Sequence, residues 1–151
     1  MKAIPISILI LLLIAGSSAG SAATVEQPGK VDEFSFIRCD DELMRMFHYR
    51  DFLNAHPNAT AYVIVYGGRR DKRDAADAHA SRLKDLLTNS LGISAQRSVV
   101  ILGGYREQWT VELWASPPDT TKPIPTPTLK ANEVRFRKGK SKPIDFKWNC
   151  V

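Results

Sequence analysis

Two corners of this chain place arginine directly after a pair of glycines, in the sequences Gly67-Gly68-Arg69-Arg70 and Gly103-Gly104-Tyr105-Arg106. Each corner follows a short aliphatic run that is typical of a buried strand. A guanidinium group can grip carboxylate or phosphate through two parallel hydrogen bonds, and the free N–H groups at the start of a following helix also attract anions. The candidate residues of an anion-binding site are therefore Arg69, Arg70, Tyr105 and Arg106. The alternative is that the glycines only serve sharp turns and that the arginines are solvated loop charges.

Other chemistry finds little support in the residue types. In residues 24–151 no serine lies in a Gly-x-Ser-x-Gly elbow, and His48 and His56 stand too far apart on one predicted helix to share a metal ion. His79 is expected to pack on the second helix or at its edge. A carboxylate pair for glycoside hydrolysis would have to come from Asp32, Glu33, Glu107 and Glu112. We expect no metal, no cofactor and no catalytic residues, and a small hydrolase or transferase is the least favoured alternative.

The elements that position both corners follow from hydrophobic periodicity. One helix is expected from Cys39 to the His56-Pro57 pair, and a second begins within 71–74 and ends at Gly92. Strands are expected within 30–37, 61–66, 97–102 and 109–115. If the runs before the two corners are parallel strands joined by the second helix, both corners open at one edge of the sheet, where open α/β sheets usually bind ligands. The last strand is expected to form a hairpin with its predecessor.

The beginning of the chain has the layout of a secretory signal peptide. Lys2 precedes an apolar core over 3–14, and a zone of small residues ends at Ala23, which predicts cleavage there. The apolar core is shorter than a membrane span needs, and no similar run follows it. We expect an exported chain, periplasmic or secreted, without a transmembrane segment once residues 1–23 are removed. An uncleaved membrane anchor is the alternative.

The exported part divides into an α/β domain over 24–116, a Pro-rich connector over 117–129 and a basic C-terminal tail over 130–151. The net charge of +5 belongs to the tail, which carries 7 basic and 2 acidic residues, whereas residues 24–129 carry 13 basic and 14 acidic residues. An anionic partner would therefore bind at the tail or at the local arginine clusters. Export argues against nucleic acid as that partner.

The tail contains two alternating runs, over 134–138 and 144–148, which predict a small hairpin. Cys39 and Cys150 form an even count in an oxidising compartment, so we expect a disulfide that staples this hairpin to the first helix. Two separate thiols are the alternative. The basic and aromatic residues of the tail could contact anionic glycans or lipid headgroups, although a hairpin with solvated lysines explains them equally simply.

The order strand, helix, strand, helix, hairpin over residues 31–116 resembles the OmpA-like C-terminal domain. The resemblance rests on Val63-Ile64-Val65-Tyr66-Gly67, on the stretch from Leu83 to Ile93, and on Val111-Glu112-Leu113-Trp114 at the end of the closing hairpin. That family binds peptidoglycan through an aspartate after the second strand and an arginine on the second helix. These positions fall on Arg70 and near His79 here, so the resemblance implies the fold without the family's ligand pair.

Taken together, the sequence predicts an α/β fold of the α+β sandwich kind, with an OmpA-like mixed sheet of strands and helices. The leading functional hypothesis is a non-catalytic binding or scaffold protein of the cell envelope or the extracellular space. It would bind an anionic envelope component or a protein at the Gly-Gly-Arg edge of the sheet, and that ligand would be more acidic than the family's usual one. Retained peptidoglycan binding is the first alternative.

Overall fold

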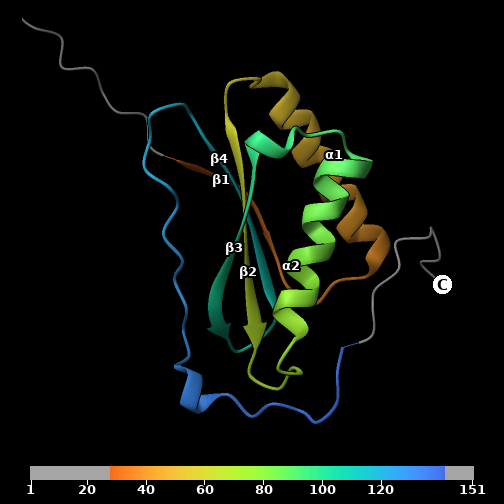
Figure 1. Cartoon of the computed structure of the whole chain (residues 1–151), viewed down its shortest axis with the longest axis vertical. Coiled ribbons are helices and arrows are strands. Elements are labelled where there is room, and N and C mark those ends of the chain that lie inside the picture. Colours follow the sequence, from red (N-terminus) through yellow and green to blue (C-terminus); the bar gives the residue numbers. More distant parts are fainter. Residues whose placement is uncertain (1–27, 142–151) are drawn as a thin grey trace, which may run out of the picture.

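The computed structural model describes residues 28–141, which build a four-stranded mixed sheet with two helices on one face (Figure 1). The elements are β1 (Gly29–Phe34), α1 (Cys39–Ala55), β2 (Thr60–Gly68), α2 (Ala75–Asp85), β3 (Ser98–Arg106) and β4 (Thr110–Ser116). The strand order is β1-β4-β2-β3, with β2 and β3 parallel and β4 antiparallel to both of its neighbours. The predicted α+β class with a mixed sheet is confirmed. Within this described part, no helix is both long enough and apolar enough to cross a membrane.

The two Gly-Gly corners lie side by side, as the sequence predicts. β2 and β3 pair in parallel from Ala61 beside Ser98 to Gly68 beside Arg106, with an irregularity just before the glycines of β2. Two parallel neighbours need a crossover connection, and α2 provides it (Figure 1). Both corners therefore open at the carboxyl ends of these strands, which we call the corner edge (residues 67–71 and 103–107).

The place of β4 in the sheet differs from the prediction. The strand runs antiparallel to β3, as a hairpin would require, but it pairs with β1 and β2 and not with β3. The connection over 107–109 crosses the end of β2, and Gly68 leaves room for it, because a Cβ atom there would lie 2.8 Å from the Trp109 backbone nitrogen. Alternation in the sequence shows which side chains face the core, but it does not show which strand is the neighbour.

The sheet face beneath the helices carries the apolar core. Its fully buried helical residues are Met46, Tyr49 and Leu53 of α1, together with Leu83 of α2 and Leu87 in the turn that follows it. Their spacing of three and four residues is the one that predicts a buried helix face. Phe52 of the same helix is 38% exposed and stacks on the ring of His56 at 4.3 Å.

The Pro-rich connector packs against the sheet on the side away from the helices (Figure 1). The backbone N–H groups of Thr128 and Leu129 both donate to the Tyr105 carbonyl, at 3.0 and 3.1 Å, and the N–H of Thr126 donates to the Tyr66 hydroxyl at 3.0 Å. Leu129 is buried. The connector is thus docked along β3 over residues 126–129, which the pattern of prolines did not predict.

The described part of the tail pairs with the loop between β2 and α2. The N–H of Arg135 donates to the Arg69 carbonyl at 2.8 Å, and the N–H of Arg137 donates to the Asp71 carbonyl at 3.0 Å. The first run of the predicted hairpin is thus laid against residues 69–72. The second run, Cys150 and the signal peptide lie outside the described residues, so the hairpin, the disulfide and the cleavage site stay predictions.

Candidate functional site

Arg106 lies at the centre of a charged network on the sheet face away from the helices. Its guanidinium stacks on the ring of Tyr66, with 3.7 Å from the guanidinium carbon to the ring centre. The same group donates to Glu112 Oε1 at 2.7 Å and to Glu33 Oε1 at 3.1 Å. It also reaches the hydroxyl of Thr126 in the connector at 2.8 Å. Arg106 therefore joins β3, β4, β1 and the connector.

Glu112 is the buried anion of this network, with only 1% of its surface exposed. Its Oε1 accepts hydrogen bonds from Lys30 at 2.9 Å and from Arg106 at 2.7 Å. Its Oε2 accepts from the indole of Trp114 at 3.0 Å and from the hydroxyl of Tyr66 at 3.1 Å. Burial alone would raise the pKa of the Glu112 carboxyl, but the four donors outweigh burial and hold the pKa below its usual value.

Gly103 makes room for this network. A Cβ atom on Gly103 would lie 2.5 Å from Cε1 of Tyr66 and 2.7 Å from Cγ2 of Ile64, closer than side chains can approach. The ring of Tyr66 can therefore lie this close to β3 only because position 103 has no side chain. The neighbouring Gly104 has a positive φ of 88° and faces Pro127 of the connector.

The first corner makes different contacts. Arg69 binds the carboxylate of Glu107 through two hydrogen bonds of 2.7 and 2.5 Å, which join the β2–α2 loop to the β3–β4 connection. The hydrogen bonds from Arg69 lower the pKa of the Glu107 carboxyl. Arg70 is exposed and forms no hydrogen bond or ion pair with any residue of 28–141. Of the two arginines at this corner, only Arg70 presents an unneutralised guanidinium.

Tyr105 contributes packing to the corner edge. Its ring meets the ring of Phe136 edge-on at 5.6 Å, and it lies so close to Gly67 that a Cβ atom there would be 3.0 Å from its ring. The ring of Phe136 also lies under the guanidinium of Arg73, at 4.5 Å. Tyr105 therefore links the second corner to the tail.

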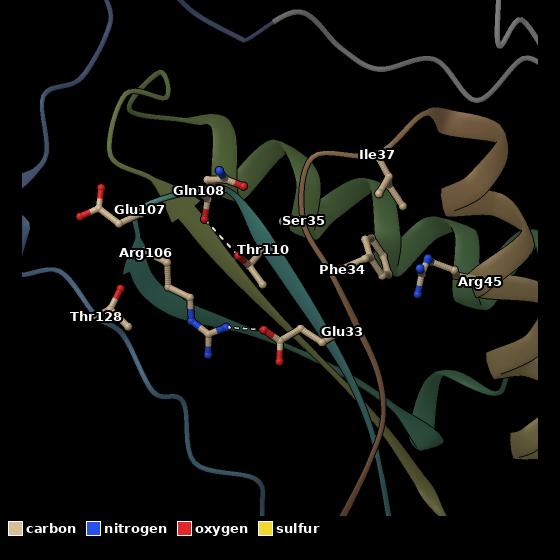
Figure 2. Close-up of a pocket in the computed structure, with 10 residues that line it drawn as sticks. All are labelled: Glu33, Phe34, Ser35, Ile37, Arg45, Arg106, Glu107, Gln108, Thr110 and Thr128. Carbon is tan, nitrogen blue, oxygen red and sulfur yellow. Dashed lines mark hydrogen bonds and ion pairs between the residues drawn. The ribbon is translucent and has the colours of Figure 1, made fainter.

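An open pocket of about 660 Å³ lies at the same end of the sheet (Figure 2). Its charged lining consists of Arg45 and Arg106 together with Glu33 and Glu107. Figure 2 shows Arg106 and Glu33 pointing toward one another, while Arg45 enters from α1. Arg45 is itself held by both carboxylate oxygens of Asp32 at 2.7 Å, so the cations of this pocket already have anionic partners.

The four acidic residues considered for a carboxylate pair lie at three separate ion-pair sites. Glu33 and Glu112 come together, because both bind Lys30 and Arg106. Asp32 pairs with Arg45, and Glu107 pairs with Arg69. Each carboxylate is thus matched by a cation. Within residues 28–141, no group of three or more His, Cys, Asp or Glu side chains is placed to hold a metal ion.

His79 is a partly buried residue of α2. Its ring lies 4.5 Å from that of Trp109, and burial, followed by the charge of Arg82, lowers the pKa of His79 to about 4. The imidazole is therefore neutral at physiological pH. This position agrees with the expectation that His79 packs on the second helix.

The structure brings Arg69, Tyr105 and Arg106 to one edge, with Arg70 exposed beside them. Sequence reasoning missed four members of the Arg106 network. Tyr66 and Thr126 contact Arg106 itself, while Lys30 and Trp114 donate to Glu112. One signal could have pointed to this network. Glu112 and Trp114 lie on the face of β4 opposite the apolar positions, and both faces of this strand are covered. A glutamate on such a strand needs buried donors.

Compared with known proteins, the chain matches no family model, and no curated protein matches it significantly. The OmpA-like resemblance therefore stays a prediction from the residues quoted for it.

Proposed function

We propose that this chain is an exported, non-catalytic binding protein of the cell envelope or the extracellular space, and that it takes an anionic ligand at the corner edge. The observation that carries the proposal is the meeting of two basic segments far apart in the sequence. The backbone hydrogen bonds of Arg135 and Arg137 lay the tail against the loop that follows β2. The exposed cations gathered there, which we call the basic surface, are Arg70, Arg73, Arg135, Arg137, Lys138 and Lys140.

The same segments contain three acidic residues, which keep their charge but are outnumbered by the six exposed cations. Asp71 accepts a hydrogen bond from the N–H of Gly68 at 2.7 Å, and Asp74 accepts three from Ser141. Glu133 accepts from the N–H of Lys130 at 2.7 Å. These carboxylates fix the backbone of the loop and the tail, while the cations point to solvent. An anion with several charges, such as an acidic glycan or glycopeptide, matches a surface of this kind.

The arrangement of the acids supports binding over hydrolysis. A glycosidase needs one carboxylic acid with a raised pKa as its proton donor. The best buried candidate, Glu112, has a lowered pKa and two cations on the same oxygen. Four donors occupy both oxygens of the Glu112 carboxylate, so this group has a structural role in the sheet.

The test is a thermal shift titration of the exported protein with phosphate, sulfate and short acidic glycopeptides. We expect the acidic glycopeptides to raise Tm, and the Arg70→Ala/Arg135→Ala variant to lose most of that rise. Arg50→Ala is the matched control, because Arg50 is bound to its neighbour Asp51 on α1. No rise at millimolar ligand, or an equal rise in the double variant, would overturn the proposal.

The same variants distinguish peptidoglycan binding. Purified sacculi should retain the wild-type chain in a sedimentation assay if peptidoglycan is the ligand. Loss of retention in Arg70→Ala would place that ligand on the basic surface. Retention that is insensitive to Arg70 and Arg135, together with no response to acidic glycopeptides, would move the binding site elsewhere.

A further inference from the structure

A second cavity, of about 420 Å³, lies beside the corner edge between the first turns of α1 and α2. Much of its lining is apolar, from Phe36, Ile37, Ala75, Ala78 and Trp109. Phe36 is 91% exposed, although its neighbour Ile37 packs against the core. A hollow with an apolar floor and an exposed phenylalanine on its rim is a surface that proteins normally cover.

The tail is fixed at this cavity by its own contacts. Lys72 Nζ donates to the Lys140 carbonyl at 2.6 Å. Ser141 is held by Asp74: its N–H lies 3.0 Å from both carboxylate oxygens, and its hydroxyl donates to Oδ1 at 2.9 Å. Arg137 and Ser141 line the cavity themselves. Ser141, the last described residue, therefore lies at the cavity.

The residues that follow have a composition that suits the cavity. Ile144, Phe146 and Trp148 stand two positions apart, and Cys150 continues the same spacing. In an extended segment such residues share one face, while Asp145 and Lys147 take the other. The nine residues from Lys142 to Cys150 can span up to about 30 Å.

Cys39, the other cysteine of the chain, belongs to a helix that begins close to the same cavity. Cys39 is the first residue of α1, two positions after Ile37, which lines the hollow. A segment that begins at Ser141 and crosses the cavity toward Ile37 arrives at the start of α1. A tethered segment is also present at a high effective concentration, which favours it over a separate molecule.

We propose that this cavity is the docking site of the chain's own C-terminal segment, residues 142–151. Ile144, Phe146 and Trp148 cover the apolar lining, and Cys150 meets Cys39. The disulfide then forms by exchange with an oxidised disulfide donor such as oxidised glutathione. Each cysteine loses its thiol proton, one S–S bond forms, and the two electrons reduce the donor to two thiols.

The direct test is NMR on the full exported chain with labelled alanine methyl groups. We expect NOEs between the indole of Trp148 and the methyl groups of Ala75 and Ala78. The Phe146→Ser/Trp148→Ser variant should shift both methyl resonances, and the Asp145→Ser/Lys147→Ser variant is the matched control that leaves them in place. Absence of these NOEs in a chain with a complete C-terminus would overturn the proposal.

Peptide mapping without reduction tests the covalent part on the same sample. A linked pair of peptides containing Cys39 and Cys150 supports the docking, since Cys39 begins α1 two residues after Ile37, which lines the cavity. Free thiols at both positions in protein taken from the exported fraction would overturn it. Both readouts are independent of ligand binding at Arg70 and Arg135, so they separate this proposal from the proposed function.

Discussion

The two Gly-Gly corners have nearly the same sequence, but the fold uses their arginines differently. At the second corner Arg106 lies over Tyr66 and binds the buried Glu112, so it belongs to the interior of the sheet. At the first corner Arg69 binds the exposed Glu107, and Arg70 has no partner among residues 28–141. The number of carboxylates within reach, and not the motif, decides whether an arginine is structural or available to a ligand.

The largest effect on the stability of the protein is expected at Glu112, the partner of Arg106 at the second corner. Glu112→Ala removes the buried acceptor that two cations and two further donors share. We therefore expect the free energy of unfolding to fall by about 4 kcal/mol, in the range found when one partner of a buried ion pair is removed. Urea unfolding followed by circular dichroism measures it. Glu107→Ala is the control from the first corner and should leave the urea midpoint unchanged; equal effects would remove the distinction between the corners.

The next effect is steric and concerns Gly103. In Gly103→Ala the new methyl group meets Tyr66 and Ile64 at distances that neither strand can relieve without moving. We expect a loss of about 3 kcal/mol, at the upper end of the overpacking range, and a change in the near-ultraviolet signal of Tyr66. Gly29→Ala, where no atom lies within 4 Å of the added Cβ, is the matched control. A fully stable Gly103→Ala protein would show that the ring of Tyr66 is free to turn away.

A pH effect comes from His79, which lies behind the first corner. The folded protein keeps this imidazole neutral down to about pH 4, whereas the unfolded chain binds the proton below pH 6.5. The unfolded state therefore holds more protons in this window, and stability falls as the pH is lowered through it. Between pH 6.5 and about 5 we expect a loss of about 2 kcal/mol, which His79→Phe should abolish. An unchanged slope in that variant would assign the effect to another group.

The smallest effect on stability is expected at Arg70. Arg70→Ala removes an exposed side chain without a partner in the described part of the chain, so Tm should stay at its wild-type value. Differential scanning calorimetry without ligand checks this directly. If Tm falls as far as it does in Arg106→Ala, the two corners are equally structural, and Arg70 no longer serves as a clean probe of ligand binding.

The sequence predicted both helices and the four strands of the described sheet, because burial imposes a regular spacing. Val111 and Leu113 reach the core and Glu112 faces the other way, as their alternation indicates. The parallel pairing of β2 and β3 also followed, since a single helix between two aliphatic runs leaves few other connections.

Pairing between distant residues could not be predicted in the same way. The insertion of β4 between β1 and β2 requires the connection over 107–109 to cross the end of β2 at Gly68. This crossing produces no regular spacing of residues in the sequence. The partners of Arg106 come from three other elements, so no local spacing connects them. Two of the hydrogen bonds between the tail and the β2–α2 loop join backbone atoms, which any sequence carries.

The insertion of β4 has a consequence for when the protein can fold. β1 has no strand partner other than β4 in the described sheet, and β2 has β4 on one of its two sides. The chain must therefore be synthesised through Ser116 before the first strand can pair. Contacts between such distant segments form slowly, because a long loop has to close first. A nascent chain of this kind stays unfolded until late, which suits the export that we propose.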